Sequence, residues 1–207
     1  MSDSPSVHAS FAASARRWAD RPFLHIPAEA CASYHEGAID WSYAQATVTV
    51  AALAADHGNL PLRRGHRVAL MLGNRPEFIA HYLALNSLGV SVVPLNPESS
   101  PQELAHILGD SGSVAAGALP AHRELLRAAV GLLDAAIDIR FEEGARADPA
   151  AFGRPATAAH DEAALLYTSG STGAPKGCML SNAYMTTMGR WYCGMGGLCA
   201  IDAGRER

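Results

Sequence analysis

Residues 67–140 alternate short aliphatic runs with segments that carry helix start and stop signals. The aliphatic runs, each the length of a buried strand, lie at residues 67–72, 90–93, 114–117 and 136–140. The segments between them predict helices over residues 74–88, 101–110 and 121–133. Because strands joined by helical crossovers pair in parallel, this alternation predicts an α/β fold with a doubly wound, mainly parallel sheet and helices on both faces.

The helix that follows residue 100 has the clearest start signal in the chain. Ser100 and Glu103 have the spacing of an S-x-x-E capping box, and Pro101 occupies the first turn. Gly89 follows the helix predicted over residues 74–88 and can end it. The capping box and the helix-ending glycine therefore lie where the alternation of strands and helices predicts helix ends.

The chain divides into three parts in this interpretation. Residues 1–140 form an α/β subdomain, which also contains helices predicted over residues 7–19 and 43–57. Residues 141–160 have acidic, Ala, Gly and Pro character without periodicity, which predicts a surface connection. Residues 161–207 form the last part, and they contain the motif on which the functional interpretation depends.

Composition and charge exclude several classes of partner. Sixteen Lys and Arg residues against twenty Asp and Glu residues give a formal net charge of −4, so no basic surface indicates nucleic acid. No apolar run approaches the length of a membrane-spanning helix, and no secretory signal is recognisable, so we expect a cytoplasmic protein. The four cysteines lack C-x-x-C spacing and are expected as reduced thiols, most of which pack as small apolar groups.

Residues 167–177, YTSGSTGAPKG, carry the chemistry. They contain four Ser or Thr residues, three glycines and one lysine, between aliphatic runs at residues 163–166 and 177–180. Glycines allow tight turns whose N–H groups can converge on an anion, and hydroxyls donate further hydrogen bonds to phosphate oxygens. Lys176 adds a mobile positive charge. A flexible linker could share this composition, but the order of residues and the flanking strands favour a polyphosphate-binding loop.

This loop differs from a Walker A loop. Lys176 is preceded by Pro175 and followed by Gly177, whereas a Walker A lysine follows glycine and precedes Ser or Thr. The segment after the second strand predicts a helix over residues 182–195 with Ser181 as N-cap. The loop is therefore expected to join two strands, with no helix dipole directed at the phosphate.

At residues 167–177 the sequence resembles the phosphate-loop signature of the adenylate-forming, AMP-binding enzymes. This superfamily includes acyl-CoA synthetases, peptide-synthetase adenylation domains and beetle luciferase. Residues 41–43, 65–69 and 88–97 also resemble its N-terminal region in order and spacing. The resemblance thus covers nearly the whole chain.

The resemblance implies a two-step reaction. A carboxylate attacks the α-phosphorus of ATP to give an acyl-adenylate and pyrophosphate, and a thiol then accepts the acyl group. By motif position, the residues implied to line the phosphates are Thr168, Ser169, Gly170, Ser171, Thr172 and Gly173. Lys176 would counter their charge, and Thr168 or Ser169 would approach Mg²⁺. The implied ligands are ATP, Mg²⁺, a carboxylic acid and CoA.

The sequence departs from the family in length. Members are well over twice as long, and their acyl pocket, adenine-contacting Tyr-Gly-x-Thr-Glu segment, ribose-binding Asp and late catalytic Lys fall outside these 207 residues. We therefore expect a partial synthetase domain that is inactive alone and holds no catalytic residue, with a separately encoded remainder as one expected partner. Three interpretations stay open: part of an acyl-CoA ligase, part of a carrier-protein-charging adenylation domain, and an inactive remnant that binds nucleotide or serves as an interaction module.

The other chemically interesting residues receive no functional role. The nine histidines lack H-x-H and H-x-x-x-H spacing and are expected at the surface or in ordinary packing. Trp191 and Tyr192 lie on the helix predicted after the loop and are expected in the core.

Overall fold

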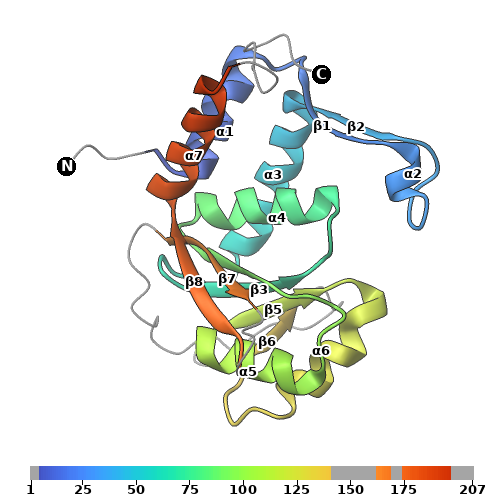
Figure 1. Ribbon diagram of the computed structural model, residues 1–207, viewed down its shortest axis with the longest axis vertical. Helices are drawn as coiled ribbons and strands as arrows, with labels where there is room; N and C mark the ends of the chain where they lie inside the picture. Colours follow the sequence, from blue (N-terminus) through green and yellow to red (C-terminus); the bar gives the residue numbers. More distant parts are fainter. Residues whose placement is uncertain (1–4, 141–161, 169–173, 197–207) are drawn as a thin grey trace.

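The computed structural model describes residues 5–140, 162–168 and 174–196. A central sheet separates two layers of helices (Figure 1). Its strands are β3 (Arg67–Met71), β4 (Ser91–Pro94), β5 (Ala115–Ala118), β6 (Asp138–Arg140), β7 (Glu162–Thr168) and β8 (Lys176–Ser181). The helices are α1 (Val7–Arg17), α2 (Ala28–Cys31), α3 (Tyr43–Gly58), α4 (Pro76–Ser87), α5 (Pro101–Ser111), α6 (Arg123–Val130) and α7 (Asn182–Gly194), with a 3₁₀ turn at Pro120–His122.

The order of strands in the sheet is β6-β5-β3-β4-β7-β8. All neighbouring pairs are parallel except β7 with β8, which is antiparallel. Helix α4 connects β3 to β4, and α5 then carries the chain to the opposite side of β3. This reversal of direction makes the sheet doubly wound, as the alternation in the sequence predicts.

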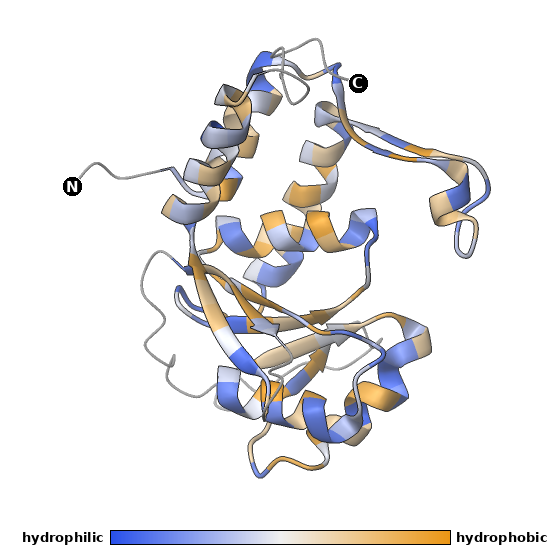
Figure 2. Ribbon diagram, viewed as in Figure 1, coloured by the Kyte–Doolittle hydropathy of each residue, from blue (hydrophilic) through white to orange (hydrophobic). Residues whose placement is uncertain are grey.

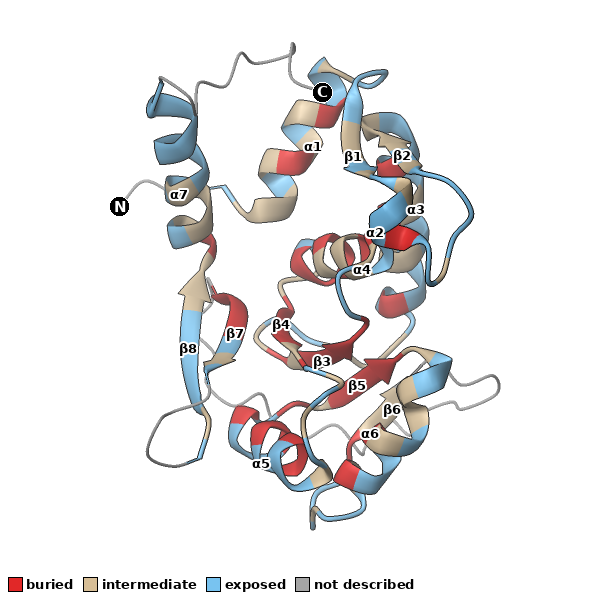
Figure 3. Ribbon diagram, turned by 45° about the vertical axis from the view of Figure 1, so that its right-hand side comes forward, coloured by how far each residue is buried: buried red, intermediate tan, exposed pale blue. Residues whose placement is uncertain are grey.

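Strand β3 is buried on both faces because helices cover both sides of the sheet. Ala69 and Met71 belong to the cluster that packs on α5 and α6, whereas Val68 and Leu70 belong to the cluster on the α4 side. Successive side chains of a strand point to opposite faces, so a continuous apolar run is what such a position requires. The apolar strands and the buried residues of β3 and β5 are visible in Figures 2 and 3.

The predicted capping box of α5 is confirmed. The Ser100 hydroxyl accepts a hydrogen bond from the Glu103 amide at 3.2 Å, and the Glu103 carboxylate accepts one from the Ser100 amide at 2.8 Å. Gly112 ends this helix with a φ of 61°, a left-handed conformation that glycine adopts without strain. Helix α6 is shorter than predicted at both ends: residues 120–122 form a 3₁₀ turn before it, and it ends at Val130 with Gly131 as the C-cap residue.

The N-terminal part adds a third apolar cluster and a small antiparallel sheet. Phe11 of α1 packs on Phe23 and Tyr43 with ring centroids 5.0 and 5.9 Å apart. Phe23 lies on β1 (Pro22–Ile26), which pairs with β2 (Ile39–Ser42). Strand β2 is short and runs directly into Ser42, the N-cap of α3.

A buried carboxylate joins β7 to the parallel strands. Glu162, the first residue of β7, accepts two hydrogen bonds from the Arg67 guanidinium at 2.8 and 2.7 Å and one from the Ser91 hydroxyl at 2.7 Å. Arg67 also donates to the carbonyl of Ser111. The hydrogen bond to Glu162 is the main cause that raises the pKa of Arg67. Three elements of the sheet layer therefore meet at one carboxylate.

Two expectations about packing are wrong. Trp191 and Tyr192 on α7 are 57% and 50% exposed, because within the described residues α7 is covered at its first turn, where Asn182 is buried. Cys178 and Cys193 are also exposed, whereas Cys31 is buried as expected.

The connection predicted at residues 141–160 lies outside the described residues. None of the helices in the described part of the chain has the length and apolarity needed to span a bilayer.

Two histidines are buried together between α3 and α4. His57 Nε2 and His81 Nδ1 lie 3.0 Å apart, so one ring donates its N–H to the other. Burial, followed by the proximity of His57, lowers the pKa of His81 from 6.5 to about 4. His81 is therefore neutral in the folded protein at neutral pH, which agrees with the expected packing role.

We expect the folded chain to lose stability as the pH falls from 6.5 towards 4. In that window the unfolded state binds a proton at His81 that the folded state excludes, so the free energy of unfolding drops by up to about 3 kcal/mol. Urea unfolding at several pH values measures this slope. His81→Gln should flatten it, and His35→Gln, at an exposed histidine, should not. Equal slopes in wild type and His81→Gln would contradict the assignment.

Candidate phosphate-binding site

The predicted phosphate-binding loop lies at the turn of a β-hairpin. Strands β7 and β8 pair in antiparallel register, and Thr168 opposite Lys176 is their last pair before the turn. The expectation that the loop joins two strands is thereby confirmed. Ser169, Gly170, Ser171, Thr172 and Gly173 lie outside the described residues.

The hairpin turn lies at the carboxyl end of the parallel strands. Strand β7 runs parallel to β4, with Val92 opposite Ala164, so Thr168 follows at the end where β4 also finishes. In open α/β sheets, ligands bind outside the carboxyl ends of the strands. The position of the hairpin in the sheet is therefore suitable for a ligand.

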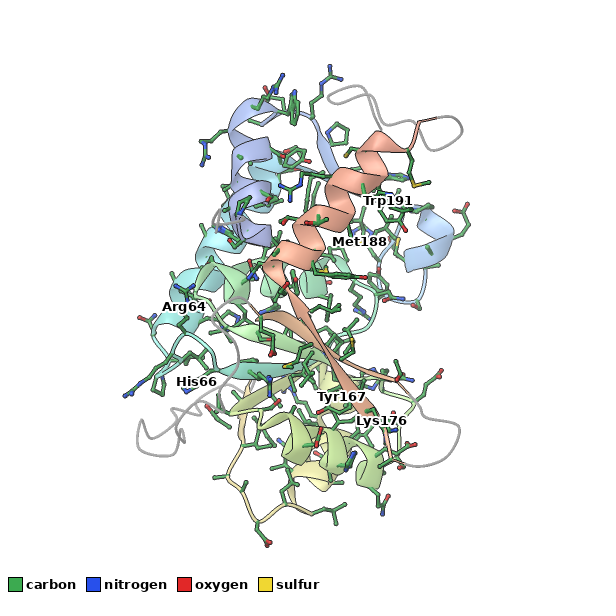
Figure 4. All side chains as sticks on the ribbon, turned by 60° about the vertical axis from the view of Figure 1, so that its left-hand side comes forward. Arg64, His66, Tyr167, Lys176, Met188 and Trp191 are labelled. Atoms are coloured by element: carbon green, nitrogen blue, oxygen red, sulfur yellow. The ribbon has the colours of Figure 1, made fainter. Side chains whose placement is uncertain are left out.

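Lys176 is the only lysine among the 207 residues, and the other fifteen basic residues are arginines. It is exposed at the start of β8, and Figure 4 shows it beside Tyr167 at the turn of the hairpin. A lysine presents a compact charge with rotatable donors, whereas an arginine presents a rigid planar fork. Lys176 is thus the one position in the sequence that carries a compact, rotatable ammonium charge.

Tyr167 fixes the other strand of the hairpin. Its ring is half-buried against the cluster under α5, and its hydroxyl donates to Asp110 Oδ2 at 2.5 Å. Burial, followed by the hydrogen bond to Asp110, raises the pKa of Tyr167 well above its ordinary value. The hydroxyl therefore stays protonated and keeps donating to the carboxylate of Asp110.

The ring of Tyr167 explains the glycine of the Pro-Lys-Gly sequence. Gly177 is paired with Tyr167 across the hairpin. A Cβ atom at Gly177 would lie 3.1 Å from Tyr167 Cζ and 3.0 Å from Leu165 Cδ1. Gly177 is thus required by packing of the hairpin, while Lys176 beside it remains free of packing constraints.

A second contact holds the turn of the hairpin on α5. His106 Nε2 lies 3.1 Å from the carbonyl oxygen of Pro175, the residue before Lys176. Sequence reasoning missed both His106 and Asp110. Their spacing of four residues places them on one side of α5, but their partners are distant in the chain, so no local pattern reveals these contacts.

The structure brings together two of the residues predicted for the site, Thr168 and Lys176. Both are exposed, and a hydroxyl and an ammonium group fit an anionic ligand. Oxygen ligands such as the Thr168 hydroxyl also suit Mg²⁺. Within the described ranges, no group of three or more His, Cys, Asp or Glu side chains could hold a metal ion. Binding of Mg²⁺ by Thr168 or Ser169 stays a prediction.

Comparison with known proteins gives consistent results. The family model described as AMP-binding enzyme matches residues 11–200. A feruloyl-CoA synthase from an Amycolatopsis species is 35% identical over 161 residues, which cover 73% of this chain and 30% of that protein. The long-chain-fatty-acid–CoA ligase FadD15 of Mycobacterium tuberculosis is 32% identical over 161 residues, covering 70% of this chain and 27% of that protein. The chain therefore spans about 30% of the length of these curated relatives.

Solved structures have the same fold. The luciferase-like enzyme from the nonluminescent mealworm Zophobas morio superimposes with a TM-score of 0.71 at 19% identity, covering 94% of this chain and 47% of that chain. A Mycobacterium tuberculosis fatty acyl CoA synthetase gives a TM-score of 0.62 at 21% identity, covering 86% and 34% respectively. At these identities the likeness establishes the fold alone.

We expect Gly177→Val to destabilise the chain by about 1–3 kcal/mol, because its side chain overpacks against the ring of Tyr167 and displaces it from Asp110. Urea unfolding provides the measurement. Gly189→Ala on α7 is the matched control, since nothing lies within 4 Å of the added Cβ atom. That control should be neutral or slightly stabilising. An unchanged stability of Gly177→Val would rule out the close contact between Gly177 and Tyr167.

Proposed function

The chain belongs to the AMP-binding enzyme family, and from this membership we propose that it is the N-terminal portion of an ATP-dependent acid–thiol ligase. In this proposal the complete enzyme activates a carboxylic acid as an acyl-adenylate and transfers the acyl group to CoA. The observation that carries the proposal is the hairpin that presents Lys176 opposite Thr168 at the carboxyl end of the sheet. CoA as the acceptor is favoured over a carrier protein because the two curated relatives are named as a CoA synthase and a CoA ligase.

The loop would bind the β- and γ-phosphates of ATP. Thr168, Ser169 and the residues through Gly173 would donate hydroxyl and backbone N–H groups, and Lys176 would neutralise charge as pyrophosphate departs. Thr168 or Ser169 would offer a hydroxyl oxygen to magnesium, which when bound would supply positive charge that offsets the charge of the phosphates. In this mechanism the loop positions the leaving group and lowers the cost of its charge, and the bond changes occur at the α-phosphorus.

The proposed organisation has three parts: an α/β subdomain at residues 1–140, a connection at residues 141–160, and a phosphate-loop segment at residues 161–207. The subdomain provides the sheet to which the hairpin is attached. The phosphate-loop segment contributes the residues that would contact ATP.

Exposed apolar residues on β8 and α7 support the proposal that a further part of the ligase covers these two elements. Met179 on β8 and Tyr184 and Trp191 on α7 are 64%, 50% and 57% exposed, and Figure 3 shows exposed residues along both elements. A groove of about 320 Å³ runs beside β8 and includes Met179 and Tyr184 in its lining. Such apolar exposure on an edge strand calls for a covering partner. We assign this role to the remaining part of the ligase, either on the same polypeptide or encoded separately.

Removal of the charge at Lys176 should weaken binding of MgATP by about tenfold or more, since a charge-assisted contact is lost. The fold should be unaffected because Lys176 is exposed. Isothermal titration of MgATP into the wild-type chain and Lys176→Ala measures the difference. Arg190→Ala, which removes the same charge from an exposed site on α7, is the control and should bind like wild type. Equal affinities of wild type and Lys176→Ala would refute the phosphate role.

The chain alone should not catalyse carboxylate-dependent exchange of labelled pyrophosphate into ATP. Large rate gains require the carboxylate, the nucleotide and the departing pyrophosphate to be held together in one site. This chain spans about 30% of the length of its curated relative, so it does not supply all of that site. The assay uses fatty, aromatic and short branched acids, with a full-length acid–CoA ligase as positive control. Robust exchange with any acid would show that the chain is a self-sufficient enzyme.

A further inference from the structure

One side of α5 holds both strands of the hairpin close to its turn. Asp110 accepts the hydrogen bond from the hydroxyl of Tyr167, which lies on β7 one residue before Thr168. His106, one helical turn away, contacts the carbonyl oxygen of Pro175 just before β8. The two contacts therefore bracket the segment that connects the strands.

The direction of the His106 hydrogen bond follows from its partner. A carbonyl oxygen can only accept, so His106 Nε2 carries the hydrogen and donates it to Pro175 at 3.1 Å. Pro175 has no N–H group, and its ring restricts φ, so this carbonyl is the polar backbone group through which a side chain can hold the residue. The peptide bond that contains this carbonyl also contains the nitrogen of Lys176.

The contact consequently fixes the backbone from which the Lys176 side chain extends. Lys176 itself is exposed, and Gly177 next to it lacks a side chain that could anchor the strand. A charge on a flexible side chain loses conformational entropy when it binds an anion, and part of that cost is avoided if the backbone is already fixed. Anchoring of Pro175 would therefore increase the affinity of Lys176 for phosphate.

We propose that His106 and Asp110 are positioning residues that hold the two ends of the phosphate loop on α5, with His106 acting on the ligand through Lys176. This inference rests on the proposed function, because it assigns a polyphosphate ligand to Lys176. Neither residue needs to touch the ligand. Their effect arises before the ligand binds, in the geometry of the free hairpin.

The test measures the affinity of the full 207-residue chain for MgATP by isothermal titration in wild type, His106→Ala and His106→Gln. Loss of one neutral hydrogen bond predicts an affinity about fivefold lower for His106→Ala. His106→Gln should recover most of the affinity, because its amide can donate to the same carbonyl. Gln102→Ala, at an exposed position in the first turn of α5, is the matched control and should equal wild type. Thermal melting should show that all these variants fold.

The double variant His106→Ala with Lys176→Ala tests whether His106 acts through the lysine. If it does, the added loss from His106→Ala should vanish once Lys176 is gone, so the two effects are strongly non-additive. The single lysine provides a second readout, because ¹³C reductive methylation labels Lys176 alone among the side chains and preserves its charge. His106→Ala should change the signal of that label in the free protein, and Gln102→Ala should leave it unchanged.

The possible failures can be told apart. If Lys176→Ala weakens binding while His106→Ala binds as tightly as wild type, the positioning role is wrong and the phosphate role stands. Additive losses in the double variant, or no recovery by His106→Gln, would also overturn the positioning role. If Lys176→Ala binds MgATP as tightly as wild type, the proposed phosphate function itself is wrong.

Discussion

The attachment of the hairpin to the parallel sheet depends on the buried carboxylate of Glu162. The backbone pairing between β4 and β7 has a single register pair, Val92 with Ala164, whereas β3 and β4 share four. Glu162 compensates for this short ladder with charge-assisted hydrogen bonds from Arg67 and one hydrogen bond from Ser91. Its side chain is 2% exposed, so loss of one charge partner would leave the other buried and unpaired, at a cost of about 3–5 kcal/mol. The hairpin is thus held by side chains where backbone pairing is weak.

A second buried polar group secures the chain after the hairpin. Asn182, the first residue of α7, accepts hydrogen bonds through Oδ1 from the Val7 amide at 2.9 Å and from Asn86 Nδ2 at 3.0 Å. Asn86 in turn accepts from the amide of His8 at 2.9 Å. Helices α1, α4 and α7 therefore meet at one pair of side-chain amides. With Glu162 at the start of β7 and Asn182 after β8, the end of the hairpin opposite the turn is fixed to the parallel strands and to helices α1 and α4.

The alternating region was predictable because its signals are local. Helix caps such as Ser100 act on residues three positions away, and the buried strands appear as continuous aliphatic runs. The contacts that position the site are not local: Glu162 lies 95 residues from Arg67, Asp110 lies 57 residues from Tyr167, and Pro175 lies 69 residues from His106. The loop could be found from its own composition, but the groups that hold it depend on how α5 crosses the hairpin. The exposure of Trp191 was missed for a related reason, since its surroundings depend on which parts of the chain cover α7.

The two types of basic residue at the hairpin have different physical tasks. Arg67 uses its planar fork to hold both oxygens of a fixed carboxylate, which is an arrangement that should not move. A group that follows a departing phosphate must instead tolerate changes in distance and direction during the reaction. A lysine meets that need, provided that its backbone does not move with it. The hairpin meets this condition by separating the two requirements: Glu162, Asp110 and His106 hold the strands, and the one lysine of the chain extends from them into solvent. Rigid attachment of the strands and mobility of the Lys176 side chain are therefore complementary features of the proposed phosphate-binding site.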